Sequence, residues 1–163
     1  MKNNFDAVIF DFDGTVADTG KGVFRCIRES VEFMGLPALS EESLRTFIGP
    51  PLHDSYIREC GVDFEKADML VKQFRKNYSA GGVFEFDIYD GIDELLSLLN
   101  KEGVKVGIGS SKPQDFVHII LQKVDLEKYF DSCEMINNTD EKTLVCILSP
   151  ALRWAIVVPL LIT

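Results

Sequence analysis

Several residue types that build common functional sites are scarce in this sequence. Its 163 residues include two histidines, His53 and His118, and four cysteines that stand far apart, with no Cys-x-x-Cys pair. Zinc sites use closely spaced cysteines and histidines, so we expect no zinc site here. With only two histidines in the sequence, a catalytic triad centred on histidine is also not expected. The wide spacing of the cysteines predicts free thiols and not a disulfide framework.

An excess of positive charge is also lacking. Lysine and arginine number 17 against 26 for aspartate and glutamate, which gives a formal net charge of −9. Nucleic-acid binding needs a basic face, so we expect no nucleic-acid partner. No secretory signal precedes the first apolar segment, and the apolar tail after Lys142 is too short and too interrupted by proline to cross a bilayer. We therefore expect a cytoplasmic protein with no membrane partner, and the composition fixes no oligomeric state.

Strand-like and helix-like segments alternate along the chain. The apolar runs predict strands at 7–10, 104–108 and 133–136, and apolar residues at helical spacing predict helices at 20–34, 52–59, 64–78, 92–103 and 114–123. This alternation is typical of an α/β fold with a parallel sheet. The helical stretch between Thr19 and Glu85, in which Ser40 begins a further helix, is too long for a simple crossover. We therefore expect residues 18–85 to form an inserted helical cap, and residues 1–17 and 86–163 to form the α/β core.

The most informative stretch is Asp11-Phe12-Asp13-Gly14-Thr15, directly after the first predicted strand. Side chains alternate along a strand, so Asp11 and Asp13 face one side, at the edge where open α/β sheets bind ligands. A carboxylate is a competent nucleophile toward phosphorus, and we assign that role to Asp11. Asp13 would protonate the leaving oxygen and later deprotonate the attacking water. Gly14 permits a tight turn with positive φ, and Thr15 is expected to cap the loop.

Such a nucleophile needs a cation beside it, because the negative charge of Asp11 repels a phosphate dianion. Mg²⁺ suits this place, since it is bound by few carboxylates together with phosphate oxygens and water. We therefore expect Mg²⁺ as cofactor, with Asp11 among its ligands. The alternative for the same residues is an acidic surface turn. The apolar strand directly before them favours the catalytic interpretation.

A second candidate phosphate element follows the second predicted strand, in Gly109-Ser110-Ser111-Lys112-Pro113. A hydroxyl at Ser110, on a turn that enters a helix, can donate to a phosphate oxygen, and the helix N-terminus adds free N–H groups. Ser111 and Lys112 could contact the substrate through their backbone N–H groups or through the ammonium group. The alternative is a serine that caps the helix beside a solvated lysine.

These motifs together resemble the haloacid dehalogenase (HAD) superfamily. Asp11–Thr15 resembles its motif I, and Ser110 within Gly109–Pro113 matches its motif II. The segment Phe47–Leu52 is similar to the cap specificity loop of phosphoglycolate phosphatase-like members. Tyr89–Ile92 is similar to the return from cap to core. The resemblance covers roughly residues 5–135.

The resemblance implies a fold and an activity. The fold is a Rossmann-like parallel sheet core with an inserted α-helical cap, and the activity is Mg²⁺-dependent hydrolysis of a small phosphate monoester through an aspartyl-phosphate intermediate. The backbone carbonyl of Asp13 would be the second metal ligand. Phosphoglycolate is one candidate for the small phosphorylated substrate, and pyrophosphate and sugar phosphates are others. Arg45 is a candidate cap cation for the substrate anion, the alternative being a solvated helix residue.

The C-terminal part departs from the pattern of the resembled superfamily. Lys142 is the candidate for its motif III lysine, and no Asp or Glu follows Glu141, so the carboxylates of motif IV are missing. We expect a truncated or frame-shifted product. Ile156–Val158 is the candidate for the place of the missing strand beside the first one, where Pro159 favours an edge or an end. The alternative is a first strand with an open edge. Loss of motif IV would impair metal binding. The alternatives are a catalytically inactive phosphate-binding or interaction protein of HAD fold, and a phosphomutase of the same superfamily.

Overall fold

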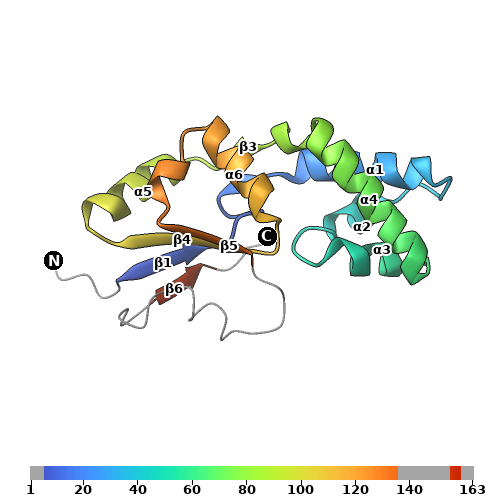
Figure 1. Ribbon diagram of the computed structural model, residues 1–163, viewed down its shortest axis with the longest axis horizontal. Helices are drawn as coiled ribbons and strands as arrows, with labels where there is room; N and C mark the ends of the chain where they lie inside the picture. The colour runs from blue at the N-terminus through green and yellow to red at the C-terminus, as the bar shows by residue number, and fades with distance from the viewer. Residues whose placement is uncertain (1–5, 136–154, 159–163) are drawn as a thin grey trace. The chain divides into compact units, whose positions relative to one another are not determined.

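The computed structural model describes residues 6–135 and 155–158 (Figure 1). Its chain divides into two compact units. Unit 1 holds the described residues up to Asp18 and those from Ile88 onward, and unit 2 runs from Thr19 to Asp87. The chain thus leaves unit 1 once, forms unit 2, and returns.

A parallel sheet forms the centre of unit 1. Among the described residues its strands stand in the order β5-β4-β1-β6, and every neighbouring pair is parallel. Their bounds are β1 Ala7–Phe10, β4 Lys105–Ser110, β5 Ser132–Met135 and β6 Ala155–Val158. All residues of β1 are buried, which explains its continuous apolar run. The sheet confirms the predicted α/β fold, and β6 lies beside β1, as Ile156–Val158 was expected to do.

Two helices connect the strands of this sheet and lie on the same side of it in Figure 1. Helix α5 (Ile92–Lys101) packs on β4, and α6 (Gln114–Lys123) packs on β5. A short 3₁₀ turn, η2 (Glu127–Tyr129), contacts both helices. Where the chain leaves and re-enters unit 1, β2 (Ala17–Asp18) pairs with β3 (Asp87–Ile88). The connections therefore place the ends of β1 and β4 next to each other.

Unit 2 is helical. Its elements are α1 Gly20–Phe33, α2 Glu41–Arg45, α3 Leu52–Cys60, α4 Phe64–Ala80 and the 3₁₀ turn η1 Gly82–Phe84. Helix α4 packs against both α1 and α3. Side chains cap two of these helices, because Ser40 accepts from the N–H of Ser43 and Asp63 accepts from the N–H of Lys66. The cap at Ser40 confirms the helix start predicted there.

A buried hydroxyl pair joins α1 to α3 inside unit 2. The Oγ of Ser30 donates to the carbonyl of Ile27 at 2.7 Å and lies 2.6 Å from the Oη of Tyr56. Since the serine has a single proton to donate, the tyrosine hydroxyl must be the donor in the second bond. Burial raises the pKa of Tyr56, so the proton stays on the ring hydroxyl.

Two glycines allow α1 and η1 to approach closely. A Cβ built on Gly22 would lie 2.1 Å from the backbone oxygen of Gly82, and one built on Gly82 would lie 2.4 Å from the Sγ of Cys26. The N–H of Gly22 also donates to the carbonyl of Glu85 at 3.2 Å. Any larger side chain at either glycine would push the two backbones apart.

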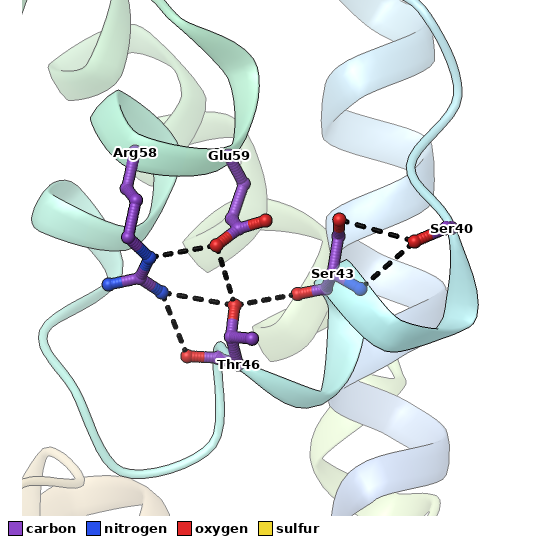
Figure 2. Close-up of polar contacts among 5 residues, drawn as sticks. All are labelled: Ser40, Ser43, Thr46, Arg58 and Glu59. Atoms are coloured by element: carbon purple, nitrogen blue, oxygen red, sulfur yellow. Dashed lines mark hydrogen bonds and ion pairs between the residues drawn. The ribbon is translucent and has the colours of Figure 1, made fainter.

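A polar cluster fixes the segment between α2 and α3, and Figure 2 shows it. We call it the Arg58 cluster, and it consists of Ser43, Thr46, Arg58 and Glu59. The guanidinium of Arg58 donates to the carbonyl and the hydroxyl of Thr46 at 3.2 and 3.0 Å, and to Glu59 at 2.8 Å. The Thr46 hydroxyl lies 2.8 Å from the carbonyl of Ser43 and 3.0 Å from the Glu59 carboxylate. The cluster therefore ties α3 to the end of α2 across the loop that begins at Phe47.

The described residues include three of the four cysteines. Cys26, Cys60 and Cys133 are free thiols. Cys26 is buried and the other two are partly exposed, whereas Cys146 lies outside the described residues. Within the described part of the chain, no helix combines the length and the apolar character needed to cross a bilayer.

Candidate active site

The register of the sheet brings the two sequence motifs of unit 1 together. Phe10 lies opposite Ile108 in the parallel pairing of β1 with β4. The carboxyl ends of the two strands therefore meet at one edge, where Asp11 follows β1 and Ser110 ends β4. This is the edge of an open α/β sheet that usually binds ligands.

The loop after β1 is a tight turn closed by backbone hydrogen bonds. The carbonyl of Phe12 accepts from the N–H groups of Thr15, Val16 and Ala17 at 3.2, 3.0 and 3.1 Å, and the N–H of Gly14 donates to Ala17 at 2.8 Å. The side chain of Phe12 is fully buried and anchors the loop. Gly14 has a φ of 81°, which confirms the predicted positive φ.

The hydroxyl of Thr15 does not cap this loop, so that expectation is wrong. Its Oγ1 is buried and has no hydrogen-bond partner among the described residues. The backbone N–H of Thr15 binds the carbonyl of Phe12 instead. The turn is already closed by main-chain bonds, which leaves the side chain no capping bond to make.

Asp11 is a partly buried carboxylate with nearby charges of both signs. Burial raises its pKa above the ordinary value of 3.8 and outweighs the opposing hydrogen bonds from the N–H of Phe12 and from Ser110. The bond from Phe12 N to Asp11 Oδ1 is 2.7 Å long. The negative charge of Asp13 raises the pKa further, and the positive charge of Lys112 lowers it. A carboxylate in this state gains from a cation placed beside it.

Asp13 forms an ion pair with Lys112, 99 residues later in the chain. The Nζ of Lys112 lies 3.1 Å from one carboxylate oxygen and 3.4 Å from the other. The lysine side chain is 6% exposed and that of Asp13 is 18% exposed. The backbone N–H of Lys112 donates to the Oγ of Ser110 at 3.3 Å. Asp11, Asp13, Ser110 and Lys112 thus form one connected group of side chains.

The sequence pattern does not predict that the Lys112 ammonium pairs with Asp13. Lys112 was expected to contact the substrate through its N–H or its ammonium group, and its alternative role was a solvated lysine. The burial of its side chain excludes the solvated lysine. The sequence alone carries no sufficient signal for this contact, because it arises only once the strand that ends two residues before Lys112 pairs with β1.

The acidic groups fit a hard cation such as Mg²⁺, but they do not complete a metal shell by themselves. Within the described residues, no group of three or more His, Cys, Asp or Glu side chains is placed to hold a metal ion. Asp11 supplies a partly buried carboxylate whose pKa is raised, mainly by removal from water. Oxygen ligands of this kind suit Mg²⁺, which keeps several waters and uses few protein groups.

The other predicted site residues lie apart from this group or outside the described residues. Ser111 is exposed, one residue after Ser110. Arg45 is an exposed residue in the last turn of α2, in unit 2. Lys142, the candidate motif III lysine, lies outside the described residues.

Comparison with known proteins identifies the family of this chain. The sequence pattern of the haloacid dehalogenase-like hydrolase family matches residues 8–143. The chain is 32% identical, over 76% of its length, to the tyrosine-protein kinase PtkA of Mycobacterium bovis, of which it covers 42%. It is 30% identical, over 76% of its length, to a 5'-nucleotidase of Pseudomonas aeruginosa, of which it covers 56%. The chain thus spans about half the length of these curated relatives.

Solved structures are similar in fold as well. A predicted phosphatase from Clostridium acetobutylicum aligns with a TM-score of 0.76 and 33% identity. The alignment covers 82% of this chain and 62% of that one. This structural similarity agrees with the α/β fold of the chain.

Proposed function

Because the chain belongs to the haloacid dehalogenase-like hydrolase family, we propose that it is a Mg²⁺-dependent phosphatase acting on a small phosphate monoester. The observation that carries the proposal is the group at the ends of β1 and β4. There, a partly buried carboxylate with a raised pKa lies beside a second carboxylate and a serine hydroxyl. These are the parts that phosphoryl transfer through a covalent intermediate needs.

Asp11 would attack the phosphorus and form an aspartyl-phosphate. Its position directly after β1, fixed by the hydrogen bond from the N–H of Phe12, holds the carboxylate still. Asp13, two residues later in the same closed turn, would act in its protonated form and give that proton to the leaving oxygen. The resulting carboxylate would then take a proton from the attacking water, which restores the protonated form. Gly14 and Thr15 keep the turn narrow, so that the two carboxylates stay on one edge.

Ser110 would bind a phosphate oxygen, with the loop that follows it. Ser110 is the last residue of β4, and its hydroxyl hydrogen-bonds to Asp11. Ser111 and Lys112 follow it in the segment before α6, where their backbone N–H groups belong to the same loop. Mg²⁺, bound by the Asp11 carboxylate and the Asp13 carbonyl, would neutralise the charge that otherwise repels the phosphate. Lys142 would add positive charge, in the role of the superfamily's motif III lysine.

The substrate is a small phosphorylated metabolite, for which phosphoglycolate is our first candidate. The support is the similarity of Phe47–Leu52 to the cap specificity loop of phosphoglycolate phosphatase-like proteins. In this proposal unit 2 is the cap, Arg45 on α2 is its cation for a substrate anion, and the protein works in the cytoplasm. Neither nucleic acid nor a membrane surface is a partner, which agrees with the net charge of −9.

One experiment tests the reaction. Hydrolysis of p-nitrophenyl phosphate and of phosphoglycolate is measured with Mg²⁺, with EDTA, and with the Asp11→Asn variant. We expect phosphate release that needs Mg²⁺ and falls by about 1,000-fold or more in Asp11→Asn, since removal of a nucleophile abolishes most of the rate. Soluble, folded wild-type protein that releases no phosphate from either compound would refute the proposal. It would favour an inactive phosphate-binding or interaction protein.

A second candidate is transfer of the phosphoryl group to an acceptor other than water. The similarity to the tyrosine-protein kinase PtkA favours it, because that relative is named as a protein that phosphorylates tyrosine. A phosphomutase would belong to the same class. Incubation with a ³²P-labelled donor and candidate acceptors separates the two functions, since a transferase moves the label to the acceptor whereas a phosphatase releases it as inorganic phosphate.

A further inference from the structure

The ammonium of Lys112 is buried, which requires a compensating charge. An ammonium group removed from water is strongly unfavourable unless a carboxylate or several acceptors surround it. Lys112 finds that partner in Asp13, with Nζ within 3.4 Å of both carboxylate oxygens. Contact with both oxygens restrains the rotation of the carboxylate more than a bond to one oxygen does.

The main chain of Lys112 is tied to the same site. Its N–H donates to the Oγ of Ser110 at 3.3 Å, and the Ser110 hydroxyl in turn hydrogen-bonds to Asp11. Lys112 is therefore linked to one carboxylate through its backbone and to the other through its side chain. A change in the orientation of Asp13 would require this whole connected group to move.

The backbone of Asp13 lies in the closed turn, and its side chain reaches Lys112, which is outside that turn. The hydrogen bonds that close the turn run between main-chain atoms from Phe12 to Ala17. The orientation of the carboxylate then depends on what contacts it, and a general acid must point one oxygen at the leaving group. The contact with the Lys112 ammonium supplies such a restraint.

We propose that Lys112 is a positioning residue, whose ammonium group holds the Asp13 carboxylate in a fixed orientation and does not itself bind the transferred phosphate. This inference rests on the proposed function for its catalytic meaning. The ion pair itself does not depend on that function. Ser110 and the backbone N–H groups of the loop are then the phosphate ligands at the end of β4.

The first test is a double-mutant cycle in urea unfolding, in buffer without metal or substrate. Lys112→Met keeps the length of the side chain and removes its charge, and Asp13→Asn removes the partner charge. We expect Lys112→Met to lower the urea midpoint in the wild-type background and to lower it by less than half as much in the Asp13→Asn background. Lys101→Met, on the exposed face of α5, is the matched control and should leave the midpoint unchanged.

One outcome of the double-mutant cycle would contradict the role of Lys112. Equal shifts by Lys112→Met in both backgrounds would mean that the two groups are not coupled, and this would overturn the inference. If Lys112→Met alone fails to fold, folding of the Lys112→Met, Asp13→Asn double variant supports coupling, and failure of that variant while Asp13→Asn folds overturns it. Lys112→Arg is expected to have a higher urea midpoint than Lys112→Met, because arginine keeps the positive charge.

The second test separates positioning from phosphate binding. We expect Lys112→Met to lower kcat for an alkyl phosphate about tenfold more than for p-nitrophenyl phosphate, whose leaving group needs little protonation. The dissociation constant of inorganic phosphate, measured by calorimetry with Mg²⁺, should change less than twofold in Lys112→Met and rise in Ser110→Ala. A tenfold weaker phosphate affinity in Lys112→Met would overturn the inference. A wild-type chain without hydrolysis would refute only the proposed function, and the urea cycle would still decide the role of Lys112.

Discussion

Phe10 and Ile108 lie opposite each other in neighbouring parallel strands, and this pairing sets the candidate site. Asp11 comes one residue after the first of them and Ser110 two residues after the second. A shift of the register by one residue would turn every side chain of one strand to the other face of the sheet. The distance between Asp11 and Ser110 therefore depends on the packing of the sheet core.

Asp11→Asn is expected to stabilise the fold at neutral pH in metal-free buffer. Burial raises the pKa of Asp11 above 3.8, so the folded state holds this proton more tightly than the unfolded chain does. This group therefore lowers the free energy of unfolding as pH rises from about 3.8 through its folded-state pKa, and the cost persists above that window. Asn removes that cost while abolishing turnover.

Urea midpoints of wild type and Asp11→Asn between pH 4 and pH 7.5 check this prediction. The difference between the two proteins should grow with pH and then level off. Mg²⁺ should reduce this difference, because in the proposed function the metal would bind the wild-type carboxylate. A variant less stable than wild type across the whole range would contradict the assignment of Asp11 as an under-compensated charge.

Gly22→Ala is expected to destabilise the fold by about 2 kcal/mol or more, because the added Cβ overlaps backbone atoms that cannot move aside easily. The Cβ would lie 2.1 Å from the backbone oxygen of Gly82. Thermal unfolding by circular dichroism measures the loss. Lys21→Ala, at the exposed neighbouring position of α1, is the control and should stay within about 0.5 kcal/mol of wild type. Equal midpoints for the two variants would show that α1 and η1 are not packed this closely.

Ser55→Ala is expected to stabilise the fold by about 1 kcal/mol, because it removes a buried hydroxyl that was desolvated without gaining a bond. The Oγ of Ser55 is buried in α3 and has no hydrogen-bond partner among the described residues. Ser79→Ala provides the comparison, since the Ser79 hydroxyl is exposed and donates to the carbonyl of Arg75 at 2.8 Å. A loss of stability in Ser55→Ala, measured by urea unfolding, would reveal a hydrogen bond to a bound water.

Arg58→Met is expected to loosen the segment between α2 and α3. The guanidinium of Arg58 is about half exposed, so we expect a modest effect of about 0.6 kcal/mol, or roughly threefold faster local opening. Amide exchange at Ile48, whose N–H donates to the carbonyl of Arg45 at 3.3 Å, reports that opening. Arg58→Lys should not restore the wild-type rate, because lysine has a single nitrogen, whereas Arg58 uses one nitrogen for Glu59 and another for Thr46.

Exchange at a residue outside the Arg58 cluster serves as the internal reference. The N–H of Ala67, which donates to the carbonyl of Asp63 at 3.0 Å near the start of α4, should exchange at the same rate in wild type and variant. Faster exchange at both amides would indicate general destabilisation of unit 2. Unchanged exchange at Ile48 would show that the cluster does not restrain the loop.

Much of the local structure followed from the sequence. The apolar run of β1, the helical spacing of α1 and the capping serine before α2 are patterns that extend over a few residues, and the structure has them where they were predicted. The acidic motif and Ser110 were also recognisable as candidate site residues, because each stands directly after or at the end of a strand. Local sequence is sufficient here, since strand and helix periods involve near neighbours only.

The tertiary structure decided which distant groups meet. Nothing in the local pattern of Lys112 distinguishes a solvated lysine from a buried partner of Asp13, and only the pairing of β1 with β4 brings the two together. The contact of Gly22 with Gly82 depends in the same way on how α1 and η1 pack. Such contacts follow from strand register and helix packing, which depend on the whole core and not on any short segment.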